Sequence, residues 1–407
     1  MATEQTFVIV GASLAGAKAA ETLRAEGFDG RVVLIGEETE RPYERPMLSK
    51  EYLRGDKPAA KLYVHDEGFY ADNDIQLLTG TRVASFDPAA HEVTLGDGSR
   101  MPYSRLLLST GASPRRLPLP GTDLPGVRYL RQMGDSDALR VAIIAAGRVV
   151  VIGAGWIGSE VAASARQLGA EVAMVAPSQV PLERVLGPEI GGVYRDLHAE
   201  HGVDLHLSTQ INAIVGTVAA QGVRTTDGSV IEGDLVVVGV GVSPRDELAR
   251  EAGLTVENGI VVDEFLRTSA ADIFAAGDVA ATWNPMYNRR IRMEHWANAL
   301  NQGQTAARNM LGQNTAYAKL PYFYSDQYDL GMEYNGYAAD WDRVVVRKGT
   351  SVLEFLAFWL KDGRVLAAMN ANVWDQGDGI KALIRSGATV DADRLADLSV
   401  PLAELAS

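Results

Sequence analysis

The chain has 407 residues, enough for two or three domains with complete hydrophobic cores. Its 38 basic and 52 acidic residues leave a formal net charge of -14, which argues against non-specific binding to nucleic acid. The absence of cysteine excludes disulfide scaffolds, thiolate metal sites, iron–sulfur ligation and any thiol-based redox relay within the chain.

The sequence also gives no sign of membrane insertion or export. No uncharged apolar stretch of about 18 residues is present, so we expect no membrane span. The first residues, Met1–Gln5, lack the basic region of a secretory signal, and the apolar run that follows is predicted to be the first strand of the fold. We therefore expect a cytoplasmic protein that binds neither membranes nor nucleic acid.

Two glycine-rich turns, each directly behind a short apolar strand, open two predicted domains. Gly11-Ala-Ser-Leu-Ala-Gly16 follows Phe7–Val10, and Gly153-Ala-Gly-Trp-Ile-Gly158 follows Val149–Ile152. In such a turn the first glycine permits a tight bend, the middle position lets a pyrophosphate approach, and the last lets the next helix pack on the strand. The middle position of the first turn is Ser13, a tolerated substitute for glycine.

Each turn is followed by the same series: a hairpin turn, an apolar strand and a Gly-x-Ser-Pro segment. The two series are Gly96–Ser99, Leu106–Leu108 and Gly111–Pro114, and then Asp227–Ser229, Leu235–Val238 and Gly241–Pro244. A single glycine fingerprint is weak evidence, but a repeated series in the same order is strong. The sequence therefore predicts two dinucleotide sites, and a protein that holds two dinucleotides usually passes electrons between them.

The two copies differ at the position that binds the adenosine ribose. After the second strand of the first copy the expected acid is Glu37, with Glu38 as the alternative. In the second copy the corresponding strand, Glu171–Val175, ends in Ala176, and the acid is missing. Arg184 could face the 2′-phosphate of NADP or be an exposed surface residue, so the choice between NADH and NADPH stays open.

The remaining elements complete the predicted organisation. An alanine-rich helix is expected over Ala15–Ala25, and the turn-rich stretch Pro114–Gly121 leads into the second domain. A helix is expected around Asn298–Leu311. From about Leu320 aromatic residues concentrate, followed by strands such as Val352–Leu360. The predicted fold class is α/β, with two Rossmann-like domains (1–112 with 240–319, and 113–239) and a C-terminal α+β domain (320–407).

Further motifs point to one family. They are Arg45-Pro-Met-Leu-Ser-Lys50, Ser109-Thr-Gly111, Gly277-Asp-Val-Ala280, Glu294-His-Trp-Ala-Asn298 and Tyr324-Ser-Asp-Gln-Tyr328. With the glycine turns, they make the chain resemble the FAD-dependent NADH:ferredoxin reductases that serve oxygenases and bacterial cytochromes P450. The resemblance covers essentially the whole chain. It implies a glutathione-reductase-like layout without redox cysteines, FAD at the first site, NADH (NADPH possible) at the second, and a small iron–sulfur ferredoxin as acceptor.

The glycine turns and this resemblance together give the predicted site residues. The cofactor-binding residues are Gly11, Ser13, Leu14, Ala15, Gly16, Glu37, Arg45, Lys50, Val83, Thr110, Gly111, Arg131, Gly153, Gly155, Trp156, Ile157, Gly158, Glu160, Arg184, Gly241, Asp278, Glu294, His295 and Trp296. By the resemblance, Lys50 and Glu160 are the catalytic pair: Lys50 stabilises negative charge on the reduced flavin, and Glu160 faces the nicotinamide. The dipole of the helix that follows Gly158 would also explain a glutamate at position 160.

The chain departs from the family at three positions. Met47 stands where a second proline is usual, Ala176 replaces the usual acid, and Tyr324 stands where a tryptophan is common beside the acceptor surface. None of these changes removes a group needed for hydride transfer. For the acidic acceptor we expect a local positive patch, either Arg289, Arg290 and Arg292 or Lys381 and Arg385.

Other functions fit the sequence less well. Flavin disulfide reductases share the two-dinucleotide layout, but they need redox cysteines. The alternative function is an NAD(P)H dehydrogenase or diaphorase that reduces a quinone or another small acceptor; the tail Asp391–Leu405 is acidic and broken by Pro401, unlike a membrane-binding amphipathic helix. A binding role like that of the cell-death flavoproteins is disfavoured by the net charge. We expect a monomer or a weak homodimer.

Overall fold

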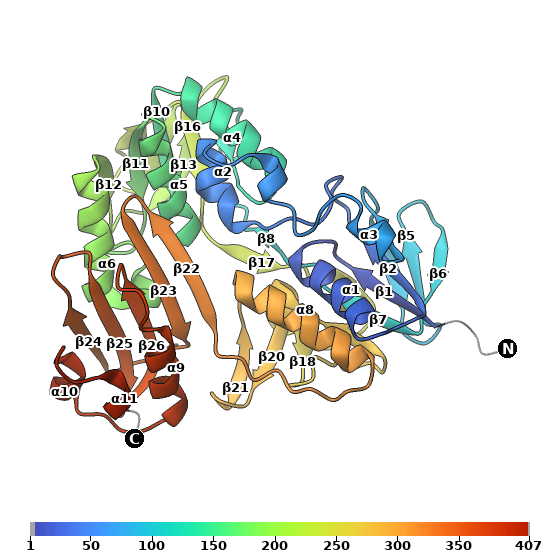
Figure 1. The fold of residues 1–407 in the computed structure, drawn as a ribbon. Coiled ribbons are helices and arrows are strands. Elements are labelled where there is room, and N and C mark those ends of the chain that lie inside the picture. Colours follow the sequence, from blue (N-terminus) through green and yellow to red (C-terminus); the bar gives the residue numbers. More distant parts are fainter. Residues whose placement is uncertain (1–4, 406–407) are drawn as a thin grey trace. The chain divides into compact units, whose positions relative to one another are not determined.

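The structure is a computed structural model that describes residues 5–405 of the chain (Figure 1). Residues 1–4 and residues 406–407 lie outside the described residues. The sequence prediction of no export signal rests on Met1–Gln5, most of which is in this first range. The chain forms two compact units. Unit 1 comprises Met1–Arg45, Ala59–Ser113 and Val242–Lys319, and unit 2 comprises Pro46–Pro58, Pro114–Gly241 and Leu320–Ser407.

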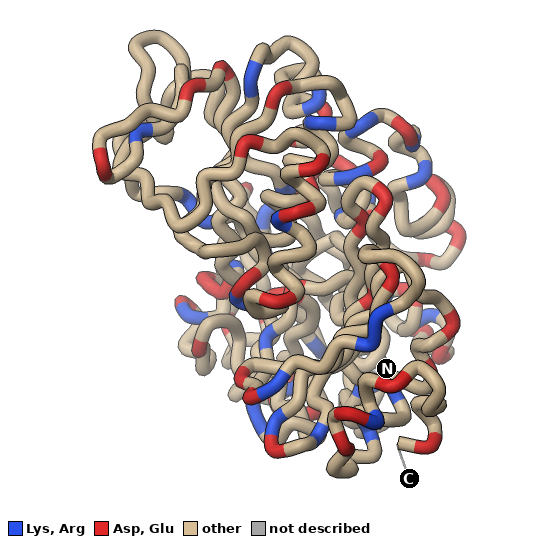
Figure 2. Tube along the Cα trace, turned by 90° about the vertical axis from the view of Figure 1, so that its left-hand side faces the viewer, with Lys and Arg blue, Asp and Glu red and all other residues tan. Residues whose placement is uncertain are grey.

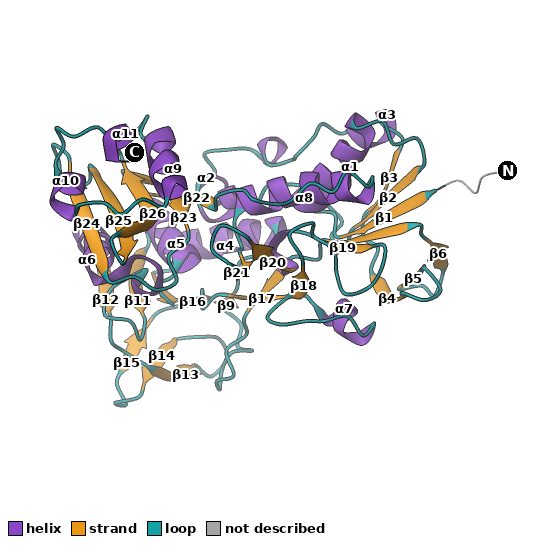
Figure 3. Ribbon diagram, turned by 90° about the horizontal axis from the view of Figure 1, so that it is seen from below, coloured by secondary structure: helices purple, strands orange, loops and turns teal. Residues whose placement is uncertain are grey.

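Unit 1 is built around a parallel five-stranded sheet. Its strands, in spatial order, are β19 (Ile273–Ala275), β7 (Arg105–Leu108), β1 (Thr6–Val10), β2 (Arg31–Ile35) and β3 (Ile75–Leu78). The central strands are apolar almost without interruption because both faces of a parallel sheet are covered. Helices α1 (Leu14–Ala25) and α8 (Trp296–Met310) lie side by side (Figures 1 and 3). Gly303 makes this possible, since a Cβ there would lie 2.3 Å from the carbonyl oxygen of Ala15.

Smaller elements complete unit 1. An antiparallel sheet contains β4 (Val83–Asp87), β5 (Glu92–Leu95) and β6 (Arg100–Pro102); another sheet contains β18 (Ile260–Val262), β20 (Ala280–Asn284) and β21 (Arg289–Arg292). The short helices are η2 (Ala59–Lys61), α3 (Phe69–Asp72), α7 (Glu247–Glu251) and η3 (Gly277–Val279). A two-stranded ladder joins β8 (Ala112–Pro114) to β17 (Val242–Pro244), where the chain passes between the units.

Unit 2 contains a second parallel sheet of the same kind. Its spatial order is β12 (Val203–His206), β11 (Glu171–Val175), β10 (Arg148–Ile152), β16 (Leu235–Val238) and β9 (Val127–Arg128). The accompanying helices are α4 (Met133–Ala145), α5 (Trp156–Gln167) and α6 (Glu183–Glu200), and the hairpin sheet is β13 (Ile211–Val215), β14 (Gly222–Thr225) and β15 (Val230–Glu232). Helix α6 is kinked at Gly187, which has a φ of 78° and precedes Pro188.

The C-terminal part of unit 2 is an antiparallel sheet with small helices. In spatial order its strands are β22 (Tyr322–Gln327), β23 (Leu330–Gly336), β26 (Arg364–Ala371), β25 (Phe355–Lys361) and β24 (Arg343–Lys348). The helices are α9 (Gly377–Ser386), α10 (Ala392–Ala396) and α11 (Leu402–Leu405), and residues 46–58 supply η1 (Pro46–Ser49) and α2 (Glu51–Arg54). Apolar side chains of β22–β26 form one core cluster with those of α6.

The predicted fold class is confirmed: two parallel Rossmann-like sheets and a C-terminal α+β part are present. One strand prediction was wrong at its start, because β25 begins at Phe355 rather than Val352. Glu354 accepts from the backbone N–H of Gly349 through its carbonyl and from the Thr350 hydroxyl through its carboxylate. These bonds close a turn that leaves Val352 exposed.

The distribution of charge and the lengths of the helices can be read directly from the described residues. Acidic and basic residues are interspersed along the trace in Figure 2 rather than gathered by sign. Within residues 5–405 no helix is long and apolar enough to cross a membrane. Nor do these residues contain a group of three or more histidine, aspartate or glutamate side chains placed to hold a metal ion.

Candidate functional site

The first glycine turn of unit 1 forms a tight cradle at the end of β1. Gly11 has a φ of 117°, and a Cβ there would lie 2.1 Å from the carbonyl oxygen of Ser109. A Cβ at Gly16 would lie equally close to the carbonyl oxygen of Gly11. Within the described chain Ser13, the residue before α1, makes no side-chain bond to the helix. The first N–H groups of α1 are therefore available to an anion, as a bound pyrophosphate requires.

Glu37 lies just beyond β2 and is held by an arginine that sequence reasoning missed. The guanidinium of Arg245 donates to both carboxylate oxygens of Glu37, at 2.6 and 2.9 Å. This bidentate bond lowers the pKa of Glu37 below its usual value. The Thr110 hydroxyl fixes Arg245 by donating to its carbonyl oxygen. Glu37 is thus an ionised, half-exposed acid at the position expected for ribose binding.

The alternative acid, Glu38, belongs to a different cluster. Arg45 donates to one oxygen of Glu38 and to the hydroxyl of Tyr43, and Tyr43 donates to the other oxygen of Glu38. Asp278 lies close enough to act electrostatically on Arg45. The motif residues Arg45 and Asp278 therefore lie near each other within unit 1, although they are far apart in the sequence.

Asp278 and the start of α8 meet the first glycine turn. Asp278 lies in η3, and a Cβ on its neighbour Gly277 would lie 3.2 Å from the Cβ of Ala15. His295, which precedes α8, is neutral because burial lowers its pKa to about 4. The indole Nε1 of Trp296 is buried and has no hydrogen-bond partner among the described residues. An unsatisfied buried donor at the start of α8, the helix that packs against α1, fits a site that is completed by a bound cofactor.

The second glycine turn, in unit 2, repeats the cradle at the end of β10. Gly153 has a φ of 101°, and a Cβ there would lie 2.5 Å from the carbonyl oxygen of Gly239. A Cβ at Gly158 would lie 2.1 Å from the Gly153 carbonyl oxygen, so the last glycine lets α5 pack closely. Nothing in the described part of the chain lies within 4 Å of a Cβ built on Gly155. The backbone before α5 is therefore open to a phosphate.

At the predicted ribose end of the second site, the residue that follows β11 is an alanine and not an acid. Ala176 is buried directly after β11, and its N–H donates to the carbonyl of His206. Arg184 lies in the first turn of α6 and is exposed. The N–H of Gln179 is bound by the Glu183 carboxylate, at 2.9 Å.

Lys50 and Glu160 form a buried ion pair within unit 2. The Nζ atom of Lys50 lies 3.2 Å from Oε2 of Glu160, and the two side chains are only 4% and 5% exposed. Ser49 donates to the same oxygen, and Ser325 donates to Oε1 at 2.7 Å. The ring of Tyr324 lies 5.6 Å from the Lys50 Nζ atom. A charged pair with this many partners is costly to bury and indicates a working site rather than a packing element.

The remaining predicted residues lie along the same elements. Leu14 and Ala15 begin α1, Val83 begins β4, Thr110 and Gly111 follow β7, Arg131 precedes α4, Trp156 and Ile157 begin α5, Gly241 precedes β17, and Glu294 pairs with Arg292. One predicted acceptor patch is largely engaged within unit 1. Arg290 donates to the carbonyls of Val262 and Ala281, and the Arg292 side chain is only 9% exposed.

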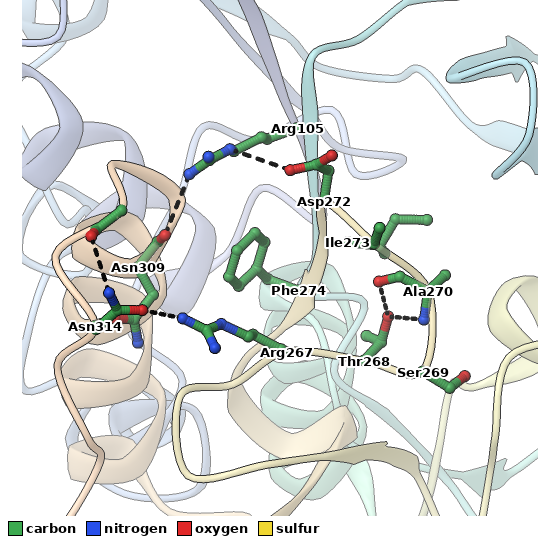
Figure 4. A pocket seen from close by; sticks show the side chains of 12 residues that line it. Arg105, Arg267, Thr268, Ser269, Ala270, Asp272, Ile273, Phe274, Asn309 and Asn314 are labelled. Carbon is green, nitrogen blue, oxygen red and sulfur yellow. Dashed lines mark hydrogen bonds and ion pairs between the residues drawn. The ribbon is translucent and has the colours of Figure 1, made fainter.

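A cavity of about 380 Å³ lies elsewhere in unit 1 (Figure 4). Its arginines already have partners: Arg105 is near Asp272 and bonds the carbonyl of Asn309, and Arg267 donates to Asn314. Arg105 and Ile273 begin β7 and β19, so the cavity lies at the amino ends of these parallel strands. Nucleotides bind at the carboxyl ends of such strands, and the cavity is therefore separate from the cradle.

Two glycine cradles on parallel sheets and a buried lysine–glutamate pair define an oxidoreductase that uses two dinucleotides. The chain belongs to the pyridine nucleotide-disulphide oxidoreductase family, whose model matches residues 5–303; a reductase C-terminal model matches residues 322–406. The predicted resemblance to ferredoxin reductases is confirmed by these matches and by the relatives below.

The relatives match over nearly their whole length. The chain is 42% identical to the ferredoxin–NAD(+) reductase component of the anthranilate 1,2-dioxygenase system of Burkholderia cepacia, over 97% of this chain and 98% of that protein. It is 41% identical to rhodocoxin reductase of Rhodococcus erythropolis, over 90% and 86%. Among solved structures, the covalent putidaredoxin reductase–putidaredoxin complex matches with a TM-score of 0.94 and 38% identity, over 100% and 98%.

Proposed function

We propose that this chain is an FAD-dependent NAD(P)H:ferredoxin reductase serving an oxygenase or a cytochrome P450. The observation that carries the proposal is the combination of two glycine cradles with the buried Lys50–Glu160 pair in a chain without cysteine. The chemistry that FAD supplies when bound is acceptance of a hydride from a nicotinamide and release of electrons one at a time. Because the chain has no thiol, those electrons must pass to an outside acceptor. The relatives named as ferredoxin reductases support a ferredoxin.

The first cradle would hold FAD. The uncapped N–H groups of α1, beginning at Leu14, would bind the pyrophosphate, and Glu37 would accept from the ribose hydroxyls. Asp278 and Arg45 would bind polar groups nearer the flavin, and Trp296 has a free indole donor to offer. We assign residues 1–112 and 240–319 to this FAD-binding domain, 113–239 to the NAD(P)-binding domain and 320–407 to the C-terminal domain.

The second cradle would hold the nicotinamide dinucleotide, with the pyrophosphate at the open backbone of Gly155. Glu160 limits the orientation of the Lys50 side chain through the 3.2 Å ion pair. The buried Lys50 side chain would in turn place a fixed positive charge in a water-poor site, where it would stabilise negative charge on a bound flavin. NADH is the proposed donor; the missing acid at Ala176 leaves room for NADPH.

The acceptor is proposed to dock near Lys381 and Arg385 on α9. Lys381 is only weakly paired, since its Nζ atom lies 3.8 Å from the fully exposed Asp378, and Arg385 is exposed. A small acidic ferredoxin would be steered to such a site by charge. The chain is proposed to act in the cytoplasm as a monomer or weak homodimer, without binding membranes or nucleic acid.

The test compares two acceptors in steady-state assays with the FAD-loaded protein. A small iron–sulfur ferredoxin and ferricyanide are reduced with NADH as donor. Lys381→Glu should slow ferredoxin reduction and weaken its salt dependence, while ferricyanide reduction stays unchanged. Lys361→Glu, at a partly exposed lysine that ends β25, is the control. Reduction of ferricyanide or a quinone without any ferredoxin reduction would instead favour a diaphorase.

A further inference from the structure

A line of buried polar side chains leads to Glu160 from within unit 2. Its members, called here the polar chain, are Ser325, Gln327, His198 and Tyr328. Ser325 donates to Oε1 of Glu160, and Gln327 Nε2 lies 3.4 Å from the Ser325 hydroxyl. The other end of the Gln327 amide, Oε1, lies 3.0 Å from His198 Nε2. The Tyr328 hydroxyl lies 3.3 Å from His198 Nδ1.

The chemistry of these groups gives the polar chain one direction. His198 is fully buried, and burial lowers its pKa to about 4, so the ring is neutral and carries one N–H. An amide oxygen can only accept, so His198 Nε2 must be the donor to Gln327. His198 Nδ1 is then an acceptor, and the Tyr328 hydroxyl donates to it. Every donor in the polar chain is therefore directed toward Glu160.

The sequence builds this arrangement by strand alternation. In β22 the residues Phe323, Ser325 and Gln327 face one way and are buried, whereas Asp326 faces the other way and is exposed. Helix α5, which carries Glu160, packs against β22. Ser325 and Gln327 are each 1% exposed and border a core of apolar side chains. Polar groups at such positions cost stability unless they are hydrogen-bonded, so the bonds within the polar chain are needed to offset that cost.

We propose that Ser325, Gln327 and His198 are positioning residues for the catalytic pair: they hold the Glu160 carboxylate oriented on Lys50. This proposal rests on the proposed reductase function. A hydrogen bond donated to one carboxylate oxygen fixes the orientation of the group, and aligned hydrogen bonds polarise one another. With Oε1 fixed by Ser325, the carboxylate can present only Oε2 to Lys50. The C-terminal strand β22 thereby acts on the catalytic pair through Ser325 and its bond to Glu160.

Removal of the Ser325 hydroxyl separates this role from simple packing. Ser325→Ala leaves Oε1 of Glu160 without its donor, so the limiting rate of flavin reduction should fall about tenfold while the apparent Kd for NADH stays unchanged. Ser325→Thr keeps a hydroxyl and should restore most of the rate. Tyr322→Phe is the matched control. Tyr322 lies in β22 like Ser325, but its hydroxyl donates to Glu333 in β23 and not to Glu160. Stopped-flow reduction of the FAD-loaded variants measures these rates.

A second measurement needs no NADH. In the ¹⁵N NMR spectrum of the FAD-loaded protein, His198 should be neutral at pH 7, protonated at Nε2 and unprotonated at Nδ1. Ser325→Ala should change the His198 ring shifts although the two residues do not touch, whereas Tyr322→Phe should leave them unchanged. A His198 ring protonated at Nδ1, or charged at pH 7, overturns the proposal.

The kinetic outcomes are equally decisive. A wild-type rate in Ser325→Ala, or an equal loss in Tyr322→Phe, overturns the positioning role. If the wild-type protein is not reduced by NADH or NADPH, the proposed function fails instead, and the His198 spectrum still tests the polar chain on its own.

Discussion

Replacing only one member of the buried Lys50–Glu160 pair should lower the free energy of unfolding more than replacing both members. At 3.2 Å and an effective dielectric constant of about 20 the attraction is about 5 kcal/mol, which is offset by the cost of burying both charges. Lys50→Met leaves a buried carboxylate, and Glu160→Gln leaves a buried ammonium. Each single change should destabilise the surrounding structure by about 3–5 kcal/mol. The double variant should lose much less than the sum, with a coupling of about 3 kcal/mol.

The assay is urea unfolding followed by hydrogen exchange of peptides from α5 and β22, in the FAD-loaded protein. Peptide resolution is needed because a chain of two compact units need not unfold in one step. Stopped-flow reduction of the same variants should be slower than that of the wild-type protein, because either change removes a charge of the catalytic pair. Additive losses in the double variant would refute the reasoning, since they would mean that the two charges do not interact.

Three further outcomes are expected. Gly11→Ala forces a Cβ to within 2.1 Å of a carbonyl oxygen at a φ of 117°, so the protein should be destabilised by about 2–4 kcal/mol and should bind less FAD. The control, Gly98→Ala, has a positive φ but open space around the Cβ, and it should keep its FAD. Equal ratios of flavin to protein absorbance in the two variants would count against the cradle. Arg245→Met removes the bidentate bond that lowers the pKa of Glu37. The stabilisation from this bond is present above the unfolded pKa of Glu37 and is lost as pH falls through its folded pKa, so the variant should melt at a lower temperature than the wild-type protein at pH 7 but at the same temperature in acid. A difference in melting temperature that does not change with pH would exclude the pair as its cause. Burial lowers the pKa of His198 to about 4, against about 6.5 in the unfolded chain, so the wild-type protein should lose stability as pH falls from about 6.5 toward 4. The His198→Gln variant should not show this loss. Melting temperatures of the two proteins that fall in parallel with pH would contradict a buried neutral ring.

The local features of the fold could be predicted from the sequence because their signals are short. A strand, a glycine turn and a helix lie within about twenty residues, and each glycine has a steric reason that recurs in both copies. The Lys50–Glu160 pair could be anticipated only from the family resemblance. Their spacing in the sequence carries no information, since only the tertiary fold brings them together.

Other parts of the site had no sequence signal that we used. Arg245 is 208 positions from Glu37 in the sequence. Its bidentate bond forms only because the chain after β17 returns to the end of β2 in the folded unit 1. One usable hint was its place directly after a Gly-x-Ser-Pro segment. His198 and Gln327, 129 positions apart, read as an ordinary helix residue and an ordinary strand residue, and only the tertiary packing joins them.

The most direct test of the reductase account is stopped-flow reduction of the FAD-loaded protein by NADH and by NADPH in parallel. The flavin absorbance should bleach with saturable kinetics in NADH, and the ratio of the two limiting rates shows what Ala176 and Arg184 permit. Protein that carries stoichiometric FAD and is bleached by neither nucleotide would contradict the central claim.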